Sequence, residues 1–147
     1  MKKIKLVVVG KLKEKFYADA CSEYLKRLNR YAEVTVCELR DRTVNEVKEE
    51  SDDILSELKG YTVLTDIGGD ALSSEQFSQM LDKAFLNYDT VTMVIGGSCG
   101  VDDRVRNAAK KKVSFGRMTY PHMLMRVILL EQIYRAFTIS EGTPYHK

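Results

Sequence analysis

Two hydrophobic patterns alternate along the chain. Short runs rich in apolar and β-branched residues are typical of strands, and they occupy residues 4–10, 32–39, 61–69, 90–97 and 112–116. Between them, apolar residues recur at helical spacing, which predicts helices over residues 13–29, 43–60, 73–88, 102–111 and 121–137. This alternation predicts an α/β fold: a doubly wound, mostly parallel sheet with helices on both faces.

Local signals indicate where several of these helices begin. Thr43 and Glu46 have the spacing of a capping box, and so do Ser73 and Gln76. Pro121 suits the first position of the last helix, because its fixed φ fits a helix and its missing N–H would have no partner there.

The last predicted helix is apolar over more than half of its circumference. Its stripe consists of Met123, Val127, Leu130, Tyr134 and Phe137, widened by Leu124, Ile128 and Ile133. One face of such a helix can cover the sheet, and the remaining apolar surface needs a second partner, which a homodimer supplies symmetrically. No repeat or linker interrupts the chain, so we expect a homodimer of single-domain subunits, each domain spanning residues 1–147.

Composition and charge indicate which cellular compartment and which kinds of partner to expect. Hydrophobic residues make up 44% of the chain, charged residues 30%, and the net charge is +2. No apolar run approaches the roughly 20 residues that cross a bilayer. Cys21, Cys37 and Cys99 show no paired spacing, which argues against a disulfide framework and against a metal cluster. We therefore expect a cytoplasmic protein without a membrane or metal partner, and the modest charge argues against tight binding of bare nucleic acid.

Three of the predicted strands end in glycines, in "TDIGGDALSSE", "IGGSCG" and "SFGRMTYPH". Ligands of open parallel sheets bind at the carboxyl ends of the strands, where glycines let the backbone approach closely. None of these stretches is a dinucleotide fingerprint or a phosphate loop. They favour a ligand held by backbone groups, such as an adenine or a small amino acid, although tight turns alone would also explain the glycines.

Catalytic candidates are few. Cys99 would need a base to act as a nucleophile, and the chain has only His122 and His146. His122 follows Pro121, where a local hydrogen bond at the helix entry is a sufficient explanation. His146 lies in the final "TPYHK", an unusual position for a rare titratable side chain.

Five stretches together resemble one family: "GKLKEKFYADACSEYLKRL", "DIGGDALSSEQF", "VIGGSCG", "FGRMTYPHMLMRVILLEQIYRAF" and "PYHK". They are similar, over the whole chain, to the ribosomal large-subunit RNA methyltransferase H family of the SPOUT superfamily. The resemblance implies a C-terminal trefoil knot, which periodicity could not reveal, and a homodimer. It also implies that S-adenosylmethionine is used to methylate N3 of a pseudouridine in large-subunit (23S) ribosomal RNA, with the assembled ribosome as the partner.

The resemblance assigns cofactor-binding positions. These are Thr65, Gly96, Phe115, Gly116, Arg117, Met118, Thr119 and Tyr120. The chain departs from the family pattern where Thr65 replaces a more common leucine and Asp70 a common lysine.

The reaction suggests roles for the C-terminal residues. The acceptor N3–H must lose its proton, and a flipped base needs a ring to stack on. We expect His146, Tyr145 and Arg126 on the catalytic side, with Arg135 and Lys147 contacting RNA. Water could instead take the proton, and Arg135 could simply pair with Glu131 four residues before it. A non-catalytic nucleotide-binding module and a ribosome-assembly factor remain alternatives.

Overall fold

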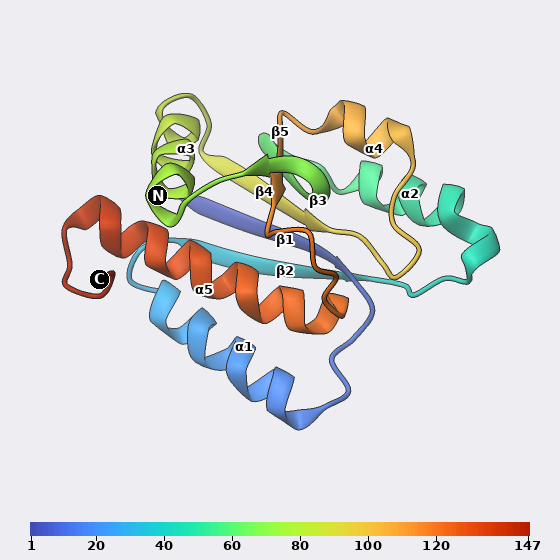
Figure 1. The fold of residues 1–147 in the computed structure, drawn as a ribbon, viewed down its shortest axis with the longest axis horizontal. Helices are drawn as coiled ribbons and strands as arrows, with labels where there is room; N and C mark the ends of the chain where they lie inside the picture. Colours follow the sequence, from blue (N-terminus) through green and yellow to red (C-terminus); the bar gives the residue numbers. More distant parts are fainter.

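Five parallel strands form one sheet at the centre of the protein (Figure 1). The computed structural model describes residues 1–147. The strands are β1 (Lys3–Val9), β2 (Glu33–Leu39), β3 (Tyr61–Ala71), β4 (Thr90–Ile95) and β5 (Lys111–Ser114), in the spatial order β2-β1-β4-β3-β5. Every pairing is parallel, so the predicted α/β class is confirmed, and the sheet is wholly rather than mostly parallel.

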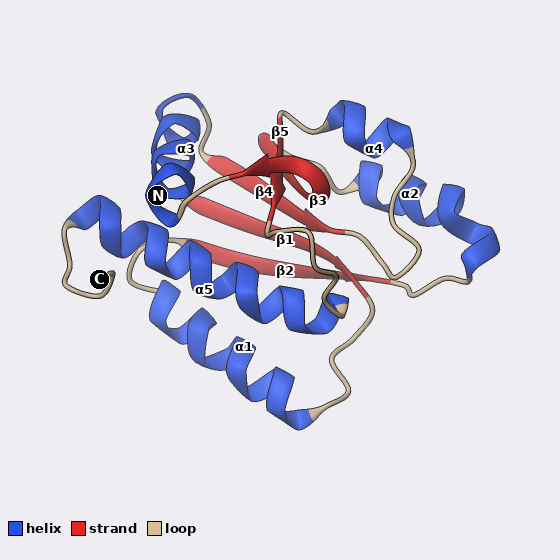
Figure 2. Cartoon of the chain, viewed as in Figure 1, coloured by secondary structure: helices blue, strands red, loops and turns tan.

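Helices cover both faces of the sheet, as the alternating pattern predicted (Figure 2). They are α1 (Lys15–Leu28), α2 (Val47–Ser56), α3 (Ser74–Asn87), α4 (Asp103–Ala108) and α5 (His122–Glu141). α5 packs between α1 and α3 over the larger core, whereas α2 and α4 pack together over a smaller one. Because β4 is covered on both sides, all six of its residues are buried, which explains its unbroken apolar and threonine pattern.

The helix boundaries follow the local signals with small shifts. Both capping boxes form, although the first begins a short 3₁₀ turn, Val44–Glu46, that leads into α2. Pro121 precedes α5 as its N-cap residue instead of occupying its first position. α5 also runs beyond the predicted end and stops at Gly142, whose φ of 70° ends the helix in the left-handed region.

The two ends of α5 lie near opposite ends of the strands (Figure 1). α5 begins beside the carboxyl ends of β1, β2 and β4, and it ends near the N-terminus of the chain (Figure 1). The C-terminal tail therefore lies away from the carboxyl ends of β1, β2 and β4 (Figure 1). None of the helices combines the length and apolar character needed to span a membrane.

Candidate functional site

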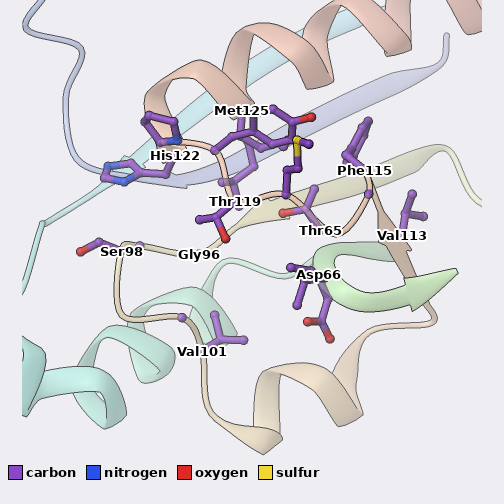
Figure 3. A pocket seen from close by; sticks show the side chains of 18 of the residues that line it. Thr65, Asp66, Gly96, Ser98, Val101, Val113, Phe115, Thr119, His122 and Met125 are labelled. Atoms are coloured by element: carbon purple, nitrogen blue, oxygen red, sulfur yellow. The ribbon is translucent and has the colours of Figure 1, made fainter. Parts of the chain in front are cut away.

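A pocket of about 710 Å³ opens where β3, β4 and β5 end (Figure 3). Three loops build it, and they are the three glycine-containing strand ends noted in the sequence. Every predicted cofactor position except Arg117 lines the pocket: Thr65, Gly96, Phe115, Gly116, Met118, Thr119 and Tyr120. Arg117 is exposed and lies outside this lining.

The β3 loop leaves the sheet before the strand ends. Its register with β5 breaks between Thr65 and Asp70, so the backbone groups of residues 66–69 have no regular ladder partners. The Thr65 hydroxyl donates to the Val94 carbonyl at 3.1 Å, which ties β3 to β4. Asp70 accepts from Lys111 at 2.6 Å, so the aspartate at this family-variant position has a structural partner on β5.

The loop after β4 requires glycine at two adjacent positions. A Cβ atom on Gly96 would lie 2.9 Å from Cγ1 of Val101, and one on Gly97 would lie 2.5 Å from Oε1 of Glu50. Both distances are shorter than normal van der Waals contacts. The backbone of this loop is consequently bare on the pocket side and closely packed behind.

The loop after β5 supplies the exposed rim. Ser114 fixes its start, since the Ser114 hydroxyl both accepts from the Gly116 N–H and donates to the Gly116 carbonyl, each at 3.1 Å. Beyond this turn, Met118 is 78% exposed and Tyr120 is 37% exposed. These apolar side chains at the mouth of the pocket are available to cover a ligand or to meet a partner surface.

The lining combines apolar walls with backbone hydrogen-bonding groups. Ile95, Val113, Phe115 and Met125 give apolar walls, while the glycine loops offer backbone N–H and C=O groups (Figure 3). The volume lies within the usual range of roughly 300–1,000 Å³ for small-molecule pockets. Apart from His122, Arg106 is the only basic side chain in the lining, and its guanidinium lies near the Asp66 carboxylate. The pocket therefore has no cluster of basic side chains that could bind a phosphate. S-adenosylmethionine, which carries no phosphate, fits these groups.

His122 and Cys99, two of the catalytic candidates from the sequence, have different surroundings. His122 lines the pocket, but its Nε2 is buried without a hydrogen-bond partner, so the predicted local hydrogen bond is not made by that atom. Cys99 is exposed and outside the pocket lining, and its thiol lies 4.0 Å from the Ser98 hydroxyl without a histidine partner. Cys99 therefore has no base to activate it.

Arg126 is only 3% exposed and does not line the pocket. Its guanidinium donates to the Glu38 carboxylate at 2.7 Å and to the Gly10 carbonyl at 3.0 Å. These contacts join α5 to the carboxyl ends of β2 and β1. The expected catalytic role gains no support from this geometry, because the charged group is occupied inside the protein.

The C-terminal tail folds back along α5 and reaches the middle of the helix. The Tyr145 hydroxyl donates to Glu131 at 2.6 Å, and its ring lies edge-on to Tyr134 with 4.8 Å between centroids. This bond to a carboxylate, together with burial, raises the pKa of Tyr145 to about 12. Arg135 bonds the same Glu131 at 2.9 Å, and its guanidinium carbon lies 4.7 Å from the Tyr145 ring centroid. The intra-helix pair of Glu131 and Arg135 thus forms, and it also anchors the tail.

His146 is held between two charged side chains. Arg135, which has only donors, contacts Nδ1 of His146 at 3.0 Å, and Glu75 contacts Nε2. Nδ1 is therefore the acceptor, and Nε2 carries the hydrogen in this arrangement. Lys147 is exposed. The expectation that the tail lies beside the cofactor loop is not met within one chain.

Several lining residues were not singled out from the sequence. Asp66, Ser98, Val101, Arg106 and Met125 belong to the pocket. The first three lie in the glycine-containing loops, so a prediction that took each loop whole would have included them. Arg106 and Met125 lie on helices, where spacing alone cannot distinguish a pocket wall from a core or solvent position.

Comparison with known proteins agrees with the resemblance in the sequence. Residues 1–146 match the family described as "Predicted SPOUT methyltransferase". A Ribosomal RNA large subunit methyltransferase H from Lactobacillus acidophilus is 46% identical, over 98% of this chain and 99% of that protein. One from Streptococcus pneumoniae is 44% identical, over 99% of both chains. The glycine-lined pocket and these full-length matches together show that the chain belongs to the SPOUT methyltransferase family.

Proposed function

We propose that the protein is an S-adenosylmethionine-dependent methyltransferase of large-subunit ribosomal RNA. The observation that carries this proposal is the pocket that three strand-end loops form without a cluster of basic side chains, in a chain whose full-length relatives are named for that activity. The proposed acceptor is N3 of a pseudouridine in 23S ribosomal RNA, methylated in the cytoplasm on the assembled ribosome. The proposed topology includes a trefoil knot formed by the C-terminal segment.

The bound cofactor supplies an electrophilic methyl group on a positively charged sulfur. The chain must hold the adenosine and methionine parts so that this group faces the acceptor nitrogen. The backbone of the loops at Thr65, at Gly96 and over residues 115–120 is placed to do this. The exposed Met118 and Tyr120 then lie at the mouth through which a base would enter.

The position of the C-terminal tail, outside the pocket of its own chain, supports a homodimer. Tyr145 and His146 contact Glu131 and Arg135, which lie six and ten residues beyond the pocket residue Met125, or roughly 9–15 Å along the helix axis at 1.5 Å per residue. In this docked position, neither Tyr145 nor His146 lines the pocket of its own chain. We infer that Tyr145 and His146 of one subunit complete the pocket of the other, across an interface that covers the partly exposed apolar face of α5.

Tyr145 and His146 then have different roles. Because its pKa is raised to about 12, Tyr145 remains protonated at neutral pH and offers a ring and a hydroxyl donor rather than a base. His146 accepts from Arg135 through Nδ1, so it can take a proton only after that contact breaks. In the docked arrangement, His146 orients groups around the base, and water is the acceptor of the N3 proton.

Two measurements test this function. Calorimetry with S-adenosylmethionine should show one site per chain, and mass spectrometry of 23S ribosomal RNA from a strain lacking the gene should show loss of one methyl group on pseudouridine. Complementation with the intact gene should restore that mass. A protein that binds no cofactor, or an unchanged RNA mass, would contradict the proposal and favour a non-catalytic ribosome-binding role.

A further inference from the structure

Helix α2 carries two buried polar side chains directly behind the pocket. Glu50 is 5% exposed and Ser51 is fully buried, although neither lines the pocket itself. They lie on the face of α2 that packs toward the β4–α4 loop, residues 96–102, which forms one wall of the pocket. A buried carboxylate is costly unless polar partners compensate it, so its position requires an explanation.

Glu50 holds the beginning of that loop. Its Oε1 lies so near Gly97 that a Cβ there would come within 2.5 Å, and its Oε2 accepts from the Arg42 N–H at 3.2 Å. Burial raises the pKa of Glu50, and interactions with the backbone N–H groups of Arg42 and Gly97 oppose that rise. Asp41 and the pocket residue His122 are also close enough to influence the charge.

Ser51 holds the other end of the loop. Its hydroxyl accepts from the Asp102 N–H at 3.1 Å. Asp102 in turn caps α4 by accepting from the Arg104 N–H at 3.0 Å, and Arg104 reaches back to Asp52 on α2 at 2.6 Å. Consecutive residues of one helix thus fix the two ends of a seven-residue loop.

We propose that Glu50 and Ser51 are positioning residues, which hold the β4–α4 loop so that the backbone at Gly96 and Gly97 faces the ligand. The inference rests on the proposed function for the identity of that ligand, S-adenosylmethionine. Because these side chains act on the loop and not on the reacting atoms, their loss should weaken cofactor binding more than it slows methyl transfer. A side chain that served only the stability of the fold would not produce this separation.

The test uses Glu50→Gln and Ser51→Ala, with Glu49→Gln as the matched control. Glu49 is the adjacent residue on α2 and is exposed, so its substitution changes the charge equally without touching the loop. Hydrogen exchange of the free protein should become about tenfold faster at the amides of residues 97–102 in both test variants, while β1 and β4 keep their protection. The Kd for S-adenosylmethionine and its KM should rise about tenfold, with kcat at saturating cofactor changed less than about twofold.

The two readouts separate the inference from the proposed function. If the wild-type protein binds no S-adenosylmethionine, the proposed function fails, and the exchange of residues 97–102 still decides whether α2 holds the loop. Unchanged exchange in both variants, or a fall in kcat with an unchanged KM, would overturn the inference. If Glu50→Gln does not fold, Ser51→Ala decides alone, because it removes only one hydroxyl.

Discussion

Gly97 is the residue at which the pocket is most closely packed. It follows β4, and its missing side chain lets the Glu50 carboxylate approach the backbone. Gly68, in the β3 loop, is the natural comparison, because a Cβ there would meet nothing within 4 Å. Two glycines in neighbouring pocket loops therefore have very different tolerance for a methyl group.

We expect Gly97→Ala to lower the free energy of unfolding by about 1–3 kcal/mol, since either Glu50 or the loop must shift. Gly68→Ala should stay within about 0.5 kcal/mol of the wild type. Urea denaturation measures both, and calorimetry with S-adenosylmethionine should show weaker binding for Gly97→Ala alone. Equal effects of the two substitutions would contradict the close packing behind Gly97.

Tyr145 gives a pH-dependent prediction. Its pKa is raised from the ordinary 10.0 to about 12, because the hydroxyl donates to Glu131 and is partly buried. A raised pKa stabilises the folded state below pH 10, and this contribution is lost as the pH rises from 10 to about 12. Wild-type stability should fall more steeply over that range than the stability of Tyr145→Phe, as urea denaturation at each pH would measure. Parallel curves would mean that the tail does not dock as described.

At the scale of elements, α5 links the pocket end of the sheet to the tail. Arg126 makes the connection near its start through Glu38 and Gly10, and Glu131 and Arg135 hold the tail farther along. Arg126 is buried and the Glu38 side chain is about a third exposed, so removing the guanidinium leaves a partly buried carboxylate and the Gly10 carbonyl without their donor.

Arg126→Met should therefore lower the free energy of unfolding by about 3 kcal/mol. The exposed Arg30 supplies the control, and Arg30→Met should change stability by less than about 0.5 kcal/mol. Folded Arg126→Met protein should retain cofactor binding, as measured by denaturation and calorimetry together. A variant of unchanged stability that no longer methylates RNA at saturating cofactor would instead restore the catalytic interpretation of Arg126.

Most elements could be predicted from the sequence because their signals are local. Strand runs, helical spacing and the two capping boxes depend on neighbouring residues, and the structure contains all ten predicted elements. The strand order and the role of Glu50 depend on which distant segments meet. In the sequence "VKEESDD", nothing separates Glu50 from solvent-exposed acids such as Glu49. Only the fold, which brings Gly97 against the Glu50 carboxylate, shows the difference.

At the scale of the whole molecule, the proposed homodimer depends on where the tail lies relative to the pocket. The pocket lies at the start of α5, whereas Tyr145 and His146 contact Glu131 and Arg135, at the middle and in the second half of the helix. A homodimer that exchanges tails would contain two equivalent sites, each with loops from one subunit and a tail from the other. Such sites can be separated genetically, because each subunit contributes a different part.

Two inactive variants should therefore restore activity when mixed. Gly96→Val distorts the pocket loop, because even a Cβ there would lie 2.9 Å from Val101, and deletion of residues 145–147 removes the tail. In a random mixture, half of the dimers are mixed and each has one complete site, so methylation of ribosomes should reach about a quarter of the wild-type rate. Ultracentrifugation should first show that both variants are dimers, and each alone should be inactive. A tail that served its own chain would leave the mixture inactive, because no chain would then have both an open pocket and a tail.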